Sequence, residues 1–193
     1  MKRVLVIGCP GAGKSTLATA LAHRTGLPLI HLDQEYWSEG WTPTPKQAWI
    51  ERLKELCGEP KWIHDGNYSG SIPGRLPFAD TVIVVDRPRW RCIFNVLRRT
   101  LSSLGKVRPD MAAGCPERFN LEFLGFIWGY QARFETRIRP LLDDATSRGT
   151  RVITVRSADE MLARIDVDAE HNKLAEHHRF PLAATDNTRA DTP

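Results

Sequence analysis

Residues 8–15 read Gly-Cys-Pro-Gly-Ala-Gly-Lys-Ser, a glycine-rich stretch that ends in a lysine and a hydroxyl side chain. The residues before it, 3–7, read Arg-Val-Leu-Val-Ile, a short apolar run typical of a buried strand. The residues after it, 16–22, place two leucines and several alanines among polar side chains, which favours a helix. A G-x-x-x-x-G-K-S pattern between a strand and a helix predicts a phosphate-binding loop, the P-loop.

The residue types of this stretch fit the binding of a nucleotide phosphate. Glycine allows a tight turn that brings backbone N–H groups close to a phosphate, and the following helix adds its positive end. Lys14 is expected to reach the β- and γ-phosphates, and the Ser15 hydroxyl to hold Mg²⁺. We therefore predict ATP and Mg²⁺ as cofactors, with ATP bound by Gly8, Cys9, Pro10, Gly11, Ala12, Gly13, Lys14, Ser15 and Thr16. The alternative is a Gly/Pro-rich turn that opens an ordinary helix.

Length and composition indicate one core-forming domain. The chain has 193 residues, 41% of them hydrophobic, and a formal charge of +4, which does not by itself imply nucleic acid. No apolar run approaches the length of a membrane span, and the first strand leaves no room for a signal peptide. No two cysteines form a C-x-x-C pair, so we expect four free thiols in a reducing cytoplasm. For Cys9, inside the predicted phosphate loop, a redox-sensitive switch is the alternative.

The rest of the chain alternates strands with helices. Further strands are expected at 29–32, 62–64, 81–85 and 151–155, and further helices at 46–57, 88–104, 117–145 and 158–165, with loops at 34–45, 69–77 and 105–116. This order predicts an α/β fold with a parallel five-stranded sheet flanked by helices and right-handed crossovers. We expect one domain over 1–165 and a polar, disordered tail over 166–193.

Three of the expected strands run into an aspartate: Asp33, Asp65 and Asp86. Ligands of parallel sheets bind beyond the carboxyl ends of the strands, so these side chains and the glycine-rich stretch are expected at one edge. Asp65, followed by a glycine that permits close approach, is the predicted Mg²⁺ ligand beside Ser15, and Asp86, which follows the more apolar run, is the alternative ligand. Asp33 opens an aromatic-rich loop and is predicted to accept a proton from an acceptor hydroxyl, or to assist Mg²⁺. The alternative for each is a turn-forming or helix-capping aspartate.

Residues 87–109 carry seven basic side chains and no Asp or Glu. Arginine donates two parallel hydrogen bonds to phosphate, and such side chains often meet the charge on a transferring phosphoryl group. We predict a lid over about 98–120 that excludes water and contributes Arg98, Arg99 and Arg108 to catalysis. Arg133 and Arg137 on the next helix are expected to complete the clamp. A solvated helix face is the preferred interpretation for Arg87 and Arg89.

Residues 88–104 also carry apolar side chains at helical spacing, which predicts one apolar face made of Trp90, Ile93, Phe94, Leu97, Leu101 and Leu104. A nucleic-acid-binding patch is a third interpretation of the arginines. No nucleic-acid motif accompanies them and the net charge is modest, so direct binding of nucleic acid is not expected.

Several segments together resemble a known family. They are the glycine-rich stretch, His31-Leu32-Asp33, the run Trp62-Ile63-His64-Asp65-Gly66-Asn67-Tyr68, the Arg-Pro-Asp-Met run at 108–111 and Gly114-Cys115-Pro116-Glu117. As a set they are similar to the adenylate-kinase-related proteins called DNA topology modulation proteins, over roughly residues 1–165. The resemblance implies a P-loop NTPase fold of the nucleotide-kinase type with an Arg-rich helical lid. It places ATP at residues 8–15, the Asp-Gly pair of such kinases at Asp65-Gly66, and their lid arginines at residues 98–108.

Two departures from true adenylate kinases concern the phosphoryl acceptor. Their Asp-Gly pair is followed closely by Pro-Arg, whereas Asn67-Tyr68 follows here and the next arginine is Arg75. The His-Leu-Asp strand end is more similar to kinases of small hydroxylated metabolites. The predicted acceptor contacts are Asp33, Asn67, Tyr68 and Arg75. The aromatic residues near the loops, Tyr36, Trp37, Trp41 and Tyr68, either stack on a base or pack beneath the loops.

These observations predict an ATP-dependent kinase that transfers the γ-phosphoryl group to a nucleotide, a nucleoside or a hydroxylated metabolite. The predicted catalytic residues are Lys14, Asp33, Arg98, Arg99 and Arg108. The alternative is a regulatory protein that binds ATP and acts through DNA or a protein partner.

Overall fold

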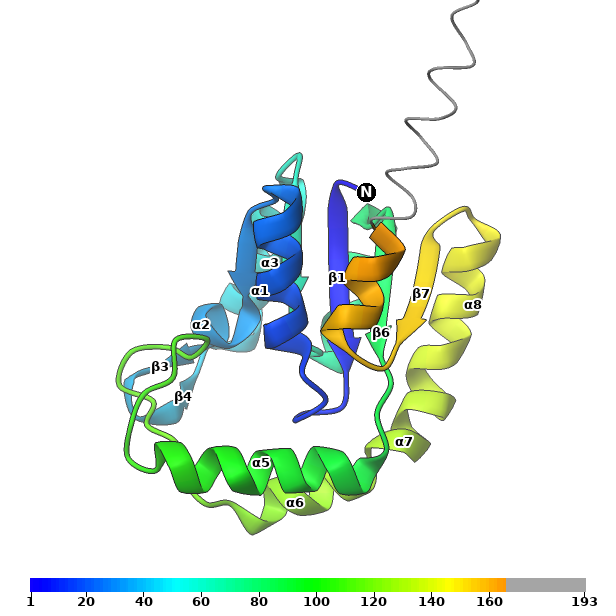
Figure 1. Ribbon diagram of the computed structural model, residues 1–193. Helices are drawn as coiled ribbons and strands as arrows, with labels where there is room; N and C mark the ends of the chain where they lie inside the picture. The colour runs from blue at the N-terminus through cyan, green and yellow to red at the C-terminus, as the bar shows by residue number, and fades with distance from the viewer. Residues whose placement is uncertain (166–193) are drawn as a thin grey trace, which may run out of the picture.

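A five-stranded sheet forms the centre of the computed structural model, which describes residues 1–165 (Figure 1). Its strands are β1 (Arg3–Gly8), β2 (Leu29–His31), β5 (Trp62–Asp65), β6 (Thr81–Val85) and β7 (Arg151–Val155). All pair in parallel, in the order β2-β5-β1-β6-β7. The predicted α/β fold and its five-stranded parallel sheet are confirmed. The predicted tail, 166–193, lies outside the described residues.

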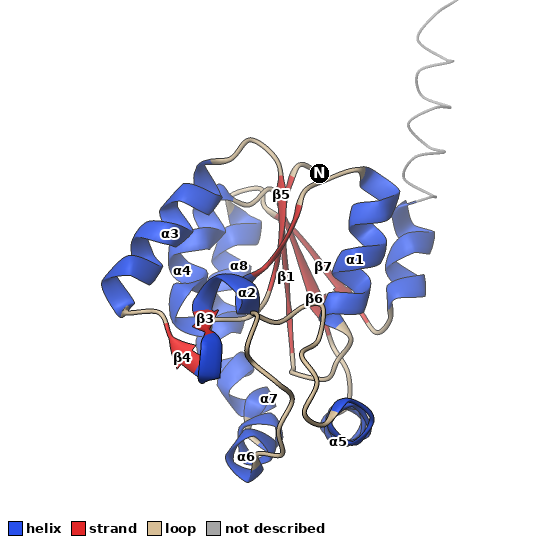
Figure 2. Cartoon of the chain, turned by 90° about the vertical axis from the view of Figure 1, so that its left-hand side faces the viewer, coloured by secondary structure: helices blue, strands red, loops and turns tan. Residues whose placement is uncertain are grey.

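Helices cover both faces of the sheet. Figure 2 shows α1 (Lys14–Thr25) and the helix over 158–165 on one side, with α3 (Lys46–Gly58), α4 (Ile72–Arg75) and α8 (Arg139–Ser147) on the other. The central strands are buried on both faces, which explains why they read as continuous apolar runs rather than as an alternation. None of the helices in the described part of the chain has the length and apolarity needed to cross a bilayer.

Two further layers lie at the carboxyl ends of the strands. Helices α5 (Arg89–Ser103) and α6 (Leu121–Trp128) cross beneath the sheet, and a small lobe made of α2 (Leu32–Tyr36), β3 (Trp37–Ser38), a 3₁₀ turn (Glu39–Trp41) and β4 (Thr42–Pro43) projects beside them (Figure 1). The loop between α5 and α6 packs on this lobe, because Met111, Ala112 and Cys115 form a cluster with Trp37 and Trp41.

The predicted loop at 34–45 is wrong in detail. The strand ends one residue earlier than expected, at His31, and Asp33 lies in the first turn of α2, where a carboxylate is favoured by the helix dipole. β3 and β4 then pair as an antiparallel ribbon. The Thr44 hydroxyl and the Thr44 N–H both donate hydrogen bonds to the Tyr36 carbonyl at the end of this ribbon. The predicted loop at 69–77 is likewise a run of short helical turns, anchored by the buried side chains of Ile72 and Leu76.

The predicted helix over 117–145 is shorter and broken. Asn120 accepts a hydrogen bond from the Phe123 N–H, so α6 begins only at Leu121. Gly129 separates α6 from α7 (Tyr130–Arg133), and a π-helical turn (Phe134–Ile138) precedes α8. Pro140, at the start of α8, lacks the N–H that a continuous helix would need.

Helix α5 buries a different face from the apolar one predicted. Cys92, Val96 and Thr100 are its buried residues, while Trp90 is 61% and Leu101 79% exposed. The reason is that α5 packs on the glycine-rich loop instead of on the sheet, and close contact with a backbone selects the smaller side chains.

Candidate functional site at the carboxyl edge of the sheet

The glycine-rich loop joins β1 to α1 and lies against α5. Gly11 has a φ of +81°, and a Cβ there would lie 2.4 Å from the Cys92 carbonyl oxygen. Asn95 of α5 donates a 2.9 Å hydrogen bond to the Gly11 carbonyl. Only glycine therefore fits where the loop meets α5. Asn95 was not among the predicted site residues.

The amino end of α1 is open to an anion. Its N-cap is Gly13, which offers no side-chain cap, and the first turn contains no acidic residue. The first N–H groups of the helix and its dipole are therefore not offset by a local carboxylate. Lys14 begins this helix and donates a 3.3 Å hydrogen bond to the Cys9 carbonyl, so its ammonium group lies over the loop.

Asn67 holds the start of the loop in place. Its amide oxygen accepts from the Gly8 N–H at 2.9 Å, and its amide nitrogen donates to the Gly8 carbonyl at 2.7 Å. Both ends of the side chain are engaged with backbone. The structure thus gives Asn67 a positioning role instead of the predicted contact with the acceptor.

We expect Asn67→Ala to destabilise the fold and to lower the affinity of the glycine-rich loop for any ligand that it binds. Two hydrogen bonds to the buried Gly8 are lost, and their backbone partners are left unpaired, at a cost of about 1–3 kcal/mol. Chemical denaturation measures this change. Gln47→Ala serves as the control, because Gln47 is an exposed α3 side chain bonded to Glu51. Equal stability of both variants would contradict the assignment.

Asp33 and Tyr68, two of the predicted acceptor contacts, are joined by a hydrogen bond. The Tyr68 hydroxyl donates a 2.7 Å hydrogen bond to Asp33 Oδ1. Burial raises the pKa of Asp33, although this hydrogen bond and the charge of Lys14 oppose the rise. Tyr68 has a left-handed φ of +38°, unusual for a bulky residue. Its ring packs against Tyr36 and Trp49, with centroids 4.7 and 5.1 Å away, so these aromatic rings are engaged with one another.

Asp65 ends β5 beside the glycine-rich loop. His31 Nδ1 lies 2.8 Å from Asp65 Oδ2, whereas the buried Oδ1 has no hydrogen-bond partner among residues 1–165. The hydrogen bond to Asp65 raises the pKa of His31. A buried carboxylate oxygen without a hydrogen-bond partner destabilises the fold. Oδ1 of Asp65 is therefore well suited to contact a cation, either directly or through a water bound to the cation.

We expect His31 to stabilise the fold more at acidic than at alkaline pH. Its pKa in the folded protein lies above the ordinary value, so the stabilisation is complete below the unfolded pKa and is lost as the pH rises through the folded one. The loss in unfolding free energy on His31→Gln should therefore be larger at about pH 5.5 than at about pH 8.5. His23→Gln, on the exposed face of α1, is the control. A pH-independent difference would argue against the His31–Asp65 pair.

A cluster of charged side chains around the buried Glu117 joins α5 to the loop that follows it. Glu117 accepts a 2.9 Å hydrogen bond from Thr100 and contacts Arg99 at 3.4 Å and Arg108 at 2.7 Å. Arg108 also binds both carboxylate oxygens of Asp110. The predicted lid arginines Arg99 and Arg108 are thus brought together, and two carboxylates fix their positions. Arg98, also predicted to be catalytic, is exposed on the opposite face of α5 and does not join them.

Arg75 is not available to a substrate. Its side chain is only 1% exposed, and its guanidinium group donates to the Gly66 and Asn67 carbonyls and to the Ser71 hydroxyl. Desolvation lowers its pKa to about 10. The predicted acceptor contact is wrong, because these bonds make Arg75 the support of the turn that carries Asn67. Of the other predicted clamp residues, Arg133 donates to the Phe126 carbonyl and Arg137 is exposed.

Three aspartates were predicted at one edge, and parallel pairing places the strands that precede them as expected. Asp86 follows β6 and lines a small cavity with Gly8, Cys9 and Arg87. Residues 1–165 contain no group of three or more His, Cys, Asp or Glu that could hold a metal. Ser15, at the amino end of α1, and Asp65 remain the chain's candidate contacts to Mg²⁺, an ion that is usually bound by one or two carboxylates plus substrate phosphates.

Comparison with known proteins adds no relative: no family model matches the chain, and a search of curated proteins finds no match.

Proposed function

We propose that this protein is a P-loop kinase that binds ATP and Mg²⁺ and transfers the γ-phosphoryl group to a small acceptor bearing a hydroxyl or a phosphate. The observation that carries the proposal is the surroundings of Asp33. This buried carboxylate, bonded to Tyr68, lies within electrostatic range of Lys14, Asp65 and Arg108. The amino end of α1, which suits a phosphate, thus lies near two cations and two carboxylates that come from separate elements. Phosphoryl transfer requires such an arrangement.

Each side chain has a role in this proposal. Lys14 and the amino end of α1 bind the phosphates of ATP. Arg99 and Arg108 lie ready to offset charge on the transferring group. Asp33 accepts the proton that the acceptor hydroxyl loses as its oxygen bonds to phosphorus, and Tyr68 orients Asp33. His31 orients Asp65 in the same way.

Mg²⁺ fits the unpartnered Oδ1 of Asp65 together with the Ser15 hydroxyl. When bound, the ion would neutralise charge on the phosphate oxygens. The lobe over 32–43 and the loop over 104–120, which pack on each other, would exclude water from the site and so disfavour hydrolysis.

A second candidate function is that of an ATP-binding regulator that acts through DNA or a protein partner. The observation in its favour is the exposed apolar face of α5, made of Trp90, Phe94 and Leu101 and continued by Leu104 just after the helix. Arg91 and Arg98 are exposed nearby. Such a protein needs no acceptor for turnover.

Acceptor dependence separates the two functions. The rate of ADP production from ATP and Mg²⁺ is measured with nucleoside monophosphates, nucleosides and small polyols, each added singly. A kinase should make ADP much faster with one of them. A slow rate that no acceptor changes, combined with salt-sensitive retention on DNA or a stable protein partner, would favour the regulator.

A further inference from the structure

Two segments near Asp33, the lobe over 32–43 and the turns over 66–80, are poor in positive charge. The lobe contains three carboxylates and neither lysine nor arginine. The turns contain one cation, Arg75, whose guanidinium group is buried and donates to two backbone carbonyls. Proteins commonly hold a phosphate with arginine or lysine side chains that are free to donate to it. These two segments therefore do not offer such a cation to an acceptor that carries a phosphate.

The arginines of α5 and of the loop that follows it are already matched by carboxylates. Arg108 contacts Glu117 at 2.7 Å and both carboxylate oxygens of Asp110. Arg99 contacts the same Glu117 at 3.4 Å. Two arginines thus face two carboxylates, which offset their charge. In the proposed function these arginines and Lys14 meet the phosphates of ATP, so they are not free to hold a second phosphate on the acceptor.

Aromatic side chains near Asp33 contact one another ring to ring. Neighbouring ring centroids lie between 4.7 and 5.6 Å apart. The two tryptophans of the lobe also pack on Met111 and Cys115. A nucleobase is commonly held by stacking on such a ring, but here the rings are engaged within the protein. The rings are those of Tyr36, Trp37, Trp41, Trp49 and Tyr68.

The lobe and the loop over 104–120 are hydrogen-bonded to each other, and Figure 1 shows this loop beside β3 and β4. The Gln34 side chain donates a 2.6 Å hydrogen bond to the Pro109 carbonyl. The Gly40 N–H donates to the Gly114 carbonyl at 3.0 Å. A planar base that entered between the lobe and the loop would break these hydrogen bonds. The contacts therefore favour an acceptor smaller than a nucleoside.

We propose that the acceptor is a small hydroxyl compound that carries no phosphate, carboxylate or nucleobase, such as a polyol or an amino alcohol. This inference rests on the proposed function and narrows it. Hydroxyl and ammonium groups donate to the carboxylates that the lobe offers, whereas an anion is repelled by them.

The transfer itself follows the proposed function. The acceptor hydroxyl oxygen bonds to the γ-phosphorus of ATP, and the bond from this phosphorus to the bridging oxygen breaks. ADP leaves with the electron pair of that bond, and Asp33 takes the proton of the hydroxyl. The products are ADP and the phosphate ester of the acceptor.

Matched pairs of acceptors test the inference. The full-length protein is incubated with Mg²⁺, γ-labelled ATP and one compound at a time: glycerol or glycerol 3-phosphate, ribose or ribose 5-phosphate, ethanolamine or glycolate, and adenosine or AMP. The label should reach an uncharged or amine-bearing compound without a base, with a kcat/KM at least about 100-fold above that of its anionic partner.

The outcomes separate this inference from the proposed function. If an anionic compound, adenosine or AMP is the best acceptor, the inference is overturned while the kinase function stands. Label recovered only as inorganic phosphate would contradict the proposed function itself and the inference with it.

Asp110→Asn tests the electrostatic reason. The substitution leaves Arg108 with one carboxylate instead of two, so an anionic acceptor should be tolerated better. For the best pair of acceptors, the kcat/KM of the anionic member relative to the uncharged one should rise at least about tenfold. Asp144→Asn, an exposed carboxylate of α8 bonded to Arg148, should leave this ratio unchanged. A ratio that Asp110→Asn does not change would overturn the electrostatic reason, and a general loss of activity cancels in the ratio.

Discussion

Lys14→Ala is expected to reduce the rate of ADP formation by at least about 100-fold, the usual cost of removing one group that stabilises transferring charge. Lys14 opens α1 and lies over the glycine-rich loop, bonded to the Cys9 carbonyl. Without its ammonium group, the amino end of α1 must hold the phosphates without a neighbouring cation. A coupled assay for ADP, at saturating ATP and acceptor, measures the rate.

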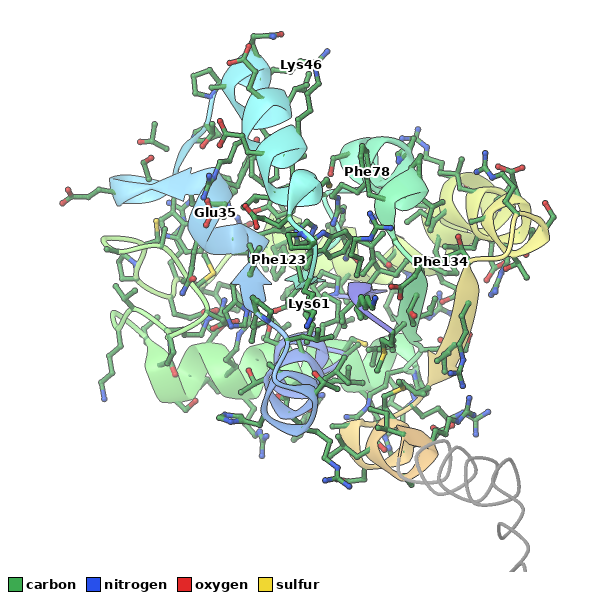
Figure 3. The ribbon with its side chains drawn as sticks, turned by 90° about the horizontal axis from the view of Figure 1, so that it is seen from above. Glu35, Lys46, Lys61, Phe78, Phe123 and Phe134 are labelled. Carbon is green, nitrogen blue, oxygen red and sulfur yellow. The ribbon has the colours of Figure 1, made fainter. Side chains whose placement is uncertain are left out.

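The control for this substitution is Lys46→Ala. Lys46 is exposed at the start of α3, and Figure 3 shows it at the outer edge of the molecule. The control removes the same charge and should keep the wild-type rate. If Lys14→Ala and Lys46→Ala retain equal activity, the glycine-rich loop does not bind the phosphates of ATP.

Asp33→Asn should lower turnover by about 100-fold or more while it leaves the affinity for ATP nearly unchanged. Asparagine keeps the acceptor for the Tyr68 hydroxyl but does not take a proton from an acceptor molecule. Because burial raises the pKa of Asp33, turnover in the wild type should rise with pH as this group deprotonates, and the variant should lack that rise. Measuring the turnover number and ATP binding across pH checks both expectations.

Stability distinguishes this result from misfolding. A carboxyl with a raised pKa stabilises the fold in its protonated form, and that contribution is lost as the pH rises through the folded pKa. Asp33→Asn removes this loss of stability, because asparagine stays neutral. The variant should therefore unfold at a higher denaturant concentration than the wild type at neutral pH. Asp144→Asn, on the exposed side of α8, should change neither turnover nor its pH dependence. Unchanged turnover in Asp33→Asn would remove Asp33 from the proposed chemistry.

Local patterns predicted the sheet because each of its longer strands is a compact apolar run, and parallel pairing then fixes where its aspartates gather. Residues 32–43 were harder to interpret, since β3 and β4 are two residues each and are held by contacts with Met111 and Cys115, far away in sequence. The apolar face of α5 misled the prediction for a related reason. Its packing is set by the backbone of the glycine-rich loop, which hydrophobic spacing does not represent.

The candidate site shows the same contrast between residues that local patterns reveal and residues that only contacts across the fold reveal. Lys14, Asp33 and Asp65 stand next to recognisable strand and helix ends, so sequence alone could select them. The partners that position the site residues, such as His31 beside Asp65 and Glu117 beside Arg99 and Arg108, are defined only by proximity in the fold. The charged run over 87–109 offered one signal for Glu117, because a buried cluster of arginines needs a carboxylate. That Arg75 supports a turn and that Arg98 stands apart from Arg99 and Arg108 could not be predicted without knowing which side chains are buried and which face solvent.

The fate of the γ-phosphate tests the central claim most directly. The wild-type protein and Lys14→Ala are incubated with ATP labelled in the γ-phosphoryl group, Mg²⁺ and the acceptor panel, and the labelled products are separated. We expect the label to appear in one organic acceptor with the wild type and to remain in ATP with Lys14→Ala. Label recovered only as inorganic phosphate, at the same rate with and without acceptors, would contradict the assignment of this protein as a kinase.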